Sequence, residues 1–217
     1  MTFFRIDDAG IAFLKQHWEL LVGQSVTSSS AADALFNSIT ELYSAKDRAY
    51  HNLSHIKALL ELCNSVRGRI QSYGAVRFAI WFHDVIYDTR KSDNEDRSAE
   101  FAAEAMGRLS VPAETIAAVR EMILATKGHS PAGASADLKL FLDLDLSILG
   151  APEEIYRAYS QAIRREYSWV PGFIYRRERK KILNSFLGRD KLYFTEPLAA
   201  KCEAQARRNI AWELENL

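Results

Sequence analysis

Apolar residues recur with a helical period along almost the whole chain. Between residues 8 and 22, Ile11, Leu14, Trp18 and Leu21 stand three or four positions apart, which places them on one face of a helix. The alternating pattern typical of strands is almost absent. Residues 76–87 are apolar nearly all round, which predicts a buried central helix. The sequence therefore predicts an all-α fold.

Residues that favour helix ends divide this pattern into segments. Pro112 and Pro152 stand where helices begin, and Ser92 with Glu95 has the spacing of a capping box. Gly128 and Gly188 are expected to end helices. We find no repeat, low-complexity linker or domain boundary, so we expect residues 1–217 to form a single domain. The predicted helices span residues 8–22, 30–42, 50–66, 76–87, 92–109, 112–126, 138–149, 152–169, 172–188 and 195 to the end.

Composition and charge exclude several classes of protein. The 28 basic residues balance the 28 acidic ones, which argues against general nucleic-acid binding. Cys63 and Cys202 lie far apart in helix-like stretches and are expected to be reduced core residues. The chain has neither a signal-like start nor an apolar run long enough to span a bilayer. We therefore expect a cytoplasmic protein with no membrane partner.

Histidines and aspartates fall in a pattern that favours a metal site. The spacing of His51 and His55 puts both on one face of a helix. Asp84 follows His83 inside the predicted buried helix, where an unpaired carboxylate is costly. A salt bridge to Arg77 or Arg48 would satisfy Asp84, but several such groups in order favour a divalent cation. The candidate groups are His51, His55, His83, Asp84, His129, Asp143 and Asp145.

Four motifs resemble those of a known superfamily. They are Tyr50-His-Asn-Leu-Ser-His55, Trp81-Phe-His-Asp-Val-Ile-Tyr-Asp88, Asn94-Glu-x-x-Ser-Ala99 and the segment Phe141–Gly150. Their order is similar to that of the HD-domain metal-dependent phosphohydrolases, and more closely to the predicted HD-superfamily phosphohydrolases of bacteria. The resemblance runs from about residue 43 to the end. It implies an HD-type helical bundle with a core at about 43–150 and additional C-terminal helices at about 151–217.

The resemblance assigns roles to individual residues. It implies that His51 is a general acid, that His55 and His83 are metal ligands, and that Asp84 is a ligand able to bridge two metals and to act in catalysis. Asp145, which is followed by Leu-Ser, is the preferred last ligand, while Asp143 lies in the same segment and leaves this position open. His129 and Glu95 could complete a second metal site or orient water. The alternatives are a loop residue for His129 and a helix cap for Glu95.

Imidazole and carboxylate ligands without thiolates suit Mn, Co, Ni, Fe, Zn or Mg ions more than calcium. Such an ion lowers the pKa of a bound water and polarises a phosphoryl oxygen. The implied reaction is the hydrolysis of a phosphate ester or anhydride in a small phosphorylated substrate, such as a nucleotide. The rival functions are a di-iron HD-type oxygenase and a non-catalytic nucleotide- or metal-binding regulatory module. The oligomeric state stays open, a homodimer included.

Three residues are candidates for contacting the substrate. Arg48 lies three positions before His51, and Arg164 can bind phosphate through its guanidinium group. Tyr167 can stack a nucleobase. The alternatives are a solvated helix face for Arg164 and core packing for Tyr167.

Overall fold

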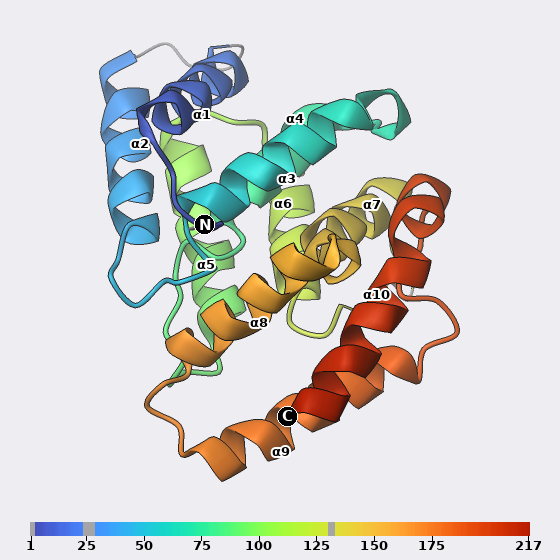
Figure 1. Cartoon of the computed structure of the whole chain (residues 1–217). Coiled ribbons are helices and arrows are strands. Elements are labelled where there is room, and N and C mark those ends of the chain that lie inside the picture. Colours follow the sequence, from blue (N-terminus) through green and yellow to red (C-terminus); the bar gives the residue numbers. More distant parts are fainter. Residues whose placement is uncertain (1–2, 24–28, 130–132) are drawn as a thin grey trace. The chain divides into compact units, whose positions relative to one another are not determined.

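The computed structural model describes residues 3–23, 29–129 and 133–217. Every regular element within these ranges is a helix, so the predicted all-α fold is confirmed (Figure 1). In chain order the elements are α1 (Asp8–Val22), α2 (Ser29–Tyr43), α3 (Leu53–Ser65), the 3-10 helix η1 (Arg67–Arg69), α4 (Tyr73–Phe82), α5 (Asn94–Arg108), α6 (Ala113–Ala125), α7 (Ala136–Asp145), the 3-10 helix η2 (Leu146–Gly150), α8 (Glu153–Glu166), α9 (Gly172–Leu187) and α10 (Glu196–Asn216). None of the helices in the described ranges has the length and apolar character needed to cross a membrane.

The chain separates into two compact units. Residues 4–142 form one, here called the N-terminal unit, and residues 143–217 together with Phe3 belong to the other, the C-terminal unit. The boundary falls within the last turn of α7, a helix that continues unbroken from Ala136 to Asp145.

In the N-terminal unit the apolar helix α4 is the central element, as its sequence predicts. Eight consecutive residues, 75–82, are buried, and α4 packs against α1, α3, α5 and α6. The Trp81 ring lies 5.3 Å from that of Trp18 and 6.0 Å from that of Phe36, both in edge-on geometry. Offset and edge-on aromatic pairs add about 0.5–1.5 kcal/mol to the burial of the rings. This cluster ties α1 and α2 to α4.

The end of α4 is not where the sequence pattern places it. The helix stops at Phe82, and residues 83–90 form turns and irregular backbone, so the prediction that it continues to Tyr87 with Asp84 inside it is wrong. The Tyr43 hydroxyl donates to the Trp81 carbonyl at 3.2 Å. The Arg48 guanidinium donates to the carbonyls of Asp84 and Val85 at 2.6 and 2.9 Å. These side chains satisfy backbone groups that would otherwise need a continuing helix.

The start of α3 also differs from the prediction. Asn52 is the N-cap, and its side-chain oxygen accepts a hydrogen bond from the Ser54 backbone N–H at 2.9 Å. Asparagine is among the best residues at this position, so the helix begins at Leu53. His51 therefore precedes the helix, and the prediction that it shares a helical face with His55 is wrong.

Two smaller predictions about helix ends are wrong as well. Asp93 is the N-cap of α5 and makes no side-chain capping bond, so Ser92 and Glu95 do not form a capping box. After α6 the left-handed residue is His129, with φ of 45°, instead of Gly128. The His129 backbone N–H donates to the Ala125 carbonyl at 2.9 Å, which closes the end of this helix.

In the C-terminal unit, helix α10 contacts α8, α9 and η2. A buried polar cluster lies along α10: Glu213 receives two hydrogen bonds from Arg179 and one from the Tyr156 hydroxyl. Nearer its middle, Asn209 donates to the carbonyls of Leu149 and Ala151, both at 2.8 Å. These bonds satisfy buried polar groups and fix α10 on its neighbours.

Candidate metal centre

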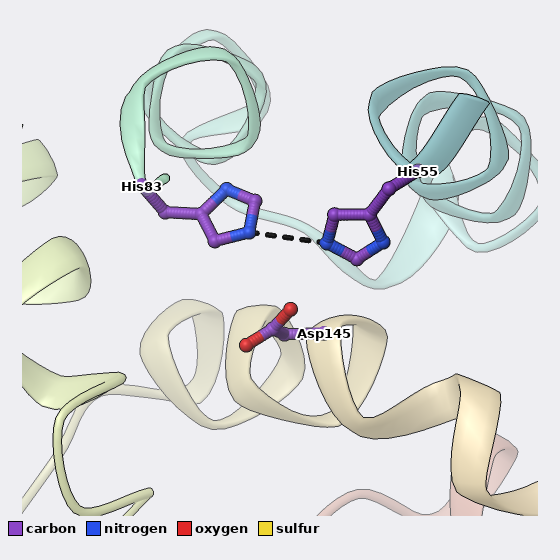
Figure 2. Close-up of side chains that lie close together, drawn as sticks. All are labelled: His55, His83 and Asp145. Atoms are coloured by element: carbon purple, nitrogen blue, oxygen red, sulfur yellow. Dashed lines mark hydrogen bonds between the residues drawn. The ribbon is translucent and has the colours of Figure 1, made fainter. Parts of the chain in front are cut away.

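Two buried histidines of the N-terminal unit face each other through their ring nitrogens. His55 lies in the first turn of α3, and His83 is the C-cap of α4. Their Nε2 atoms are 3.2 Å apart (Figure 2). The two residues are only 4% and 1% exposed. The N-cap of α3 and the early end of α4 thus bring one imidazole from each helix to one buried point.

The surroundings of His83 show which form of its ring the site favours. Its Nδ1 lies 3.0 Å from the Ile80 carbonyl, which can only accept, so Nδ1 carries the hydrogen. In the neutral ring this leaves Nε2 with a lone pair. That Nε2 faces His55 Nε2 and also Asp84 Oδ2, which is 3.1 Å away. A backbone carbonyl that fixes the tautomer and directs a lone pair into the site is the usual support of a metal-binding histidine.

Asp145 supplies a third group. It is the last residue of α7 and lies four positions after Phe141, so both side chains leave the same face of that helix. The Phe141 ring is 5.9 Å from the His83 ring, which places this face beside the histidines. One ligand atom from each of His55, His83 and Asp145 lies within 4.8 Å of the others (Figure 2). The preferred aspartate is thus the one brought to the histidine pair.

The spacing of these atoms fits a divalent cation. Two nitrogen ligands about 2.0–2.1 Å from one ion stand about 2.8–3.4 Å apart at bond angles between octahedral and tetrahedral. The 3.2 Å between the two Nε2 atoms falls within that range. A positive ion at this point would also offset the repulsion between the lone pair of His83 Nε2 and the carboxylate of Asp84, whose Oδ2 lies 3.1 Å from that nitrogen. The donor set of nitrogen and oxygen atoms agrees with the predicted transition metals.

His51 lies beside the pair and outside it. Its ring centre is 6.1 Å from that of His55 and 4.5 Å from that of Tyr87. The side chain is half-buried, whereas His55 is fully buried. The Tyr50 ring flanks both, 4.9 Å from the His55 ring and 5.0 Å from the His51 ring. A histidine close to the site and open to solvent can exchange protons without holding the ion.

Arg48 acts on this site through the backbone. Besides the Asp84 and Val85 carbonyls it binds the carbonyl of His51 at 3.1 Å, and its guanidinium group stacks 4.8 Å from the Tyr43 ring. It reaches Asp84 through the main-chain carbonyl, while Arg77, the other suggested partner of Asp84, donates to the carbonyl of His17. One side chain therefore holds both irregular segments that carry site residues. Tyr43 adds a further bond to this region, from its hydroxyl to the Trp81 carbonyl. The sequence did not identify Tyr43, because no local pattern marks a hydrogen bond that spans 38 residues.

Asp143 has a different role from Asp145. It is fully buried in the C-terminal unit, and its two oxygens accept from the backbone N–H groups of Phe194 and Thr195 at 2.8 and 2.7 Å. The Thr195 hydroxyl is a third donor to the same carboxylate. Burial raises the pKa of Asp143, and these hydrogen bonds partly oppose the shift. Asp143 anchors the segment that begins α10.

The remaining predicted residues lie elsewhere in their units. Glu95 is in the first turn of α5, and His129 follows the end of α6. In the C-terminal unit Arg164 donates to the carbonyls of Tyr167 and Val170 at 2.5 and 3.1 Å. Its guanidinium group lies over the Tyr175 ring at 4.7 Å. Arg164 thus closes the C-terminal end of α8, where Tyr167 is the C-cap.

Comparison of the chain with protein-family models, with curated proteins and with solved structures finds no match. The resemblance to the HD-domain superfamily therefore stays a prediction that rests on the motifs of this chain.

Proposed function

We propose that this protein binds a divalent metal ion through His55, His83 and Asp145 and hydrolyses a phosphate ester or anhydride. The observation that supports this proposal is the group of three ligand atoms within 4.8 Å, two of them from buried histidines. Two buried imidazoles and a partly buried carboxylate that converge on one point are costly without a compensating charge. A cation at that point would supply it.

The chain's own residues have separable roles in the proposed reaction. When bound, a divalent cation would lower the pKa of a water and polarise a phosphoryl oxygen. Ile80 holds the His83 ring through its Nδ1–H and keeps Nε2 turned to the site. Asp84, 3.1 Å from that nitrogen, either joins the ligands or accepts a proton beside them. His51, half-buried next to His55, donates a proton to the leaving oxygen.

Metal content tests the first half of the proposal. We expect purified protein loaded with Mn²⁺, Co²⁺, Ni²⁺, Fe²⁺ or Zn²⁺ to retain the ion after gel filtration, measured by inductively coupled plasma mass spectrometry. His55→Ala and His83→Ala should each lose it. His17→Ala removes a histidine of α1 outside the group and is the matched control, which should keep its metal. Equal metal content in all four proteins would refute the site.

Turnover tests the second half. Phosphate release should be screened over nucleotides and small phosphate esters with the metal-loaded protein. His51→Ala is expected to keep the metal and to lose about 10²–10⁴-fold in rate, the usual contribution of a general acid. Asp84→Ala should lose activity, and its metal content distinguishes the two roles, because metal is lost with activity if Asp84 is a ligand and is kept if Asp84 accepts a proton. Metal retention without turnover on any of these substrates would favour the regulatory module. Two irons per chain with oxygen consumption would favour the oxygenase.

A further inference from the structure

A second feature of the N-terminal unit lies apart from the histidine group: an open cleft of about 780 Å³. Residues of α1, the segment from Asn64 to Phe78, and the start of α6 line it. This volume falls in the range of about 300–1,000 Å³ that is usual for small-molecule sites. None of the metal-group residues belongs to its wall.

Arg77 brings a buried positive charge to this cleft. It lines the wall and is only 7% exposed, yet an arginine side chain stays charged at any ordinary pH. One of its terminal nitrogens donates to the His17 carbonyl, and its Nε is buried without a hydrogen-bond partner. Burial lowers the pKa of Arg77, which expresses the cost of keeping the charge there. Such a charge calls for a negative partner.

No carboxylate of the described residues forms an ion pair with Arg77. Asp137, the buried acid of this region, uses its two oxygens on the backbone N–H groups of Gln71 and Ser72, at 2.9 and 2.6 Å. Glu114 lines the cleft but is exposed to solvent. A second arginine, Arg67, also lines the cleft and lies over the Tyr73 ring at 4.9 Å. The cleft thus holds more positive than negative charge.

Backbone groups add to this positive character. The first residues of α4, Tyr73 to Ala75, line the cleft, and so do Pro112, Glu114 and Thr115 at the start of α6. Helix N-termini carry free N–H groups and a partial positive charge, and both favour anions. At Gly74 an added Cβ would meet nothing within 4 Å, so the backbone there is open to a ligand.

Leu20, Leu21, Phe78 and Val111 supply the apolar part of the wall, beside polar residues that include His17, Asn64 and Ser72. We propose that this cleft binds a small organic anion, with its phosphate or carboxylate group at Arg67 and Arg77 and its apolar or aromatic body against these side chains. The inference does not depend on the metal centre. It assigns Arg77, which the sequence suggested as a partner of Asp84, to ligand binding.

Isothermal titration calorimetry with two probes tests this proposal. Phenylphosphonate, which cannot be hydrolysed as an ester, and benzoate carry the same aromatic body on the two kinds of anion. We expect at least one of them to bind the wild-type protein, and the stronger one indicates whether the natural ligand carries phosphate or carboxylate. Arg67→Gln, an exposed substitution that leaves the core intact, should weaken binding about tenfold, as for loss of one charge-assisted hydrogen bond.

Matched variants locate the binding. Arg69→Gln removes the other arginine of η1, which does not line the cleft, and should leave the dissociation constant within about twofold. Gly74→Leu fills open space in the cleft and should abolish binding, whereas Gly107→Leu, also in open space but on α5, should not. The proposal is overturned if neither probe binds, or if Arg67→Gln and Gly74→Leu bind as tightly as the wild type.

Discussion

At the scale of single residues, neighbouring side chains of similar chemistry are separated by what surrounds them. Asp143 and Asp145 stand two positions apart, and the sequence leaves open which of them is a ligand. Asp143 is held by three donors around Thr195, while Asp145 belongs to the group with His55 and His83. The distinction depends on a segment 51 and 52 residues later, because the N–H groups that donate to Asp143 belong to Phe194 and Thr195, just before α10.

This difference leads to a paired prediction. Asp145→Ala should lower metal content and leave the melting temperature of the metal-free protein nearly unchanged, because Asp145 is only partly buried. Asp143→Ala should keep the metal and destabilise the fold by about 1–3 kcal/mol, because it leaves buried N–H groups without an acceptor. Metal analysis and urea unfolding of both variants check this. The reverse result, with metal lost only in Asp143→Ala, would exchange the two roles.

At the scale of elements, the N-cap of α3 sets the position of both histidines around it. The Asn52 side chain accepts from Ser54 and donates to the carbonyls of Phe4, Arg48 and Ala49, each at 3.3 Å. It therefore starts the helix that carries His55 and holds the irregular segment that carries His51. A single residue thus connects the two parts of the motif.

Asn52 can be tested by two substitutions. Asn52→Ala removes the cap and should cost about 0.5–2 kcal/mol of stability. Asn52→Ser keeps a capping oxygen and loses the amide without placing a carboxylate against the three carbonyls, so we expect it to be the less destabilising of the two. Both are measured by urea unfolding followed by far-UV circular dichroism. Equal stability of Asn52→Ala and the wild type would show that the cap does not fix this helix.

The elements also show how far the sequence predicts this structure. Helix starts marked by proline, before α6 and α8, agree with the prediction, because proline acts locally through its fixed φ. The end of α4 at Phe82 could not be predicted, since no glycine or proline marks it. Tyr43 and Arg48 bind its terminal carbonyl groups from a distant segment. The candidate site residues could thus be chosen from the sequence, whereas the end of α4 just before His83 could not be predicted.

At the scale of the whole molecule, buried phenol groups link the stability of the C-terminal unit to pH. Burial raises the pKa of four tyrosines in the C-terminal unit, Tyr156, Tyr159, Tyr175 and Tyr193, and that of Tyr175 reaches about 12. In the N-terminal unit, burial raises the pKa of Tyr73. Four phenol groups of the C-terminal unit must therefore stay protonated for this unit to remain folded.

Alkaline pH should consequently unfold the C-terminal unit. A tyrosine whose folded pKa is raised keeps its full contribution to stability below its unfolded pKa of 10, and loses it as pH rises above that value. Each such phenol costs about 1.4 kcal/mol per pH unit, so four together cost roughly 5 kcal/mol per unit, comparable with the whole stability of a domain. We expect a cooperative loss of structure between about pH 10 and 12, with the 295 nm phenolate absorbance rising in the same transition.

The two cysteines report separately on the two units. Cys202 lies in α10 and Cys63 in α3, and both are buried, with burial raising the pKa of Cys63 to about 12. Brief iodoacetamide pulses at increasing pH, quenched and analysed by mass spectrometry, should label Cys202 in the same pH range in which the phenolate absorbance rises. Labelling of Cys63 in the same samples reports the opening of the N-terminal unit. Cys202 that stays unlabelled through that rise, or phenolate absorbance that rises smoothly around pH 10 for all tyrosines, would contradict the assignment of the buried phenols.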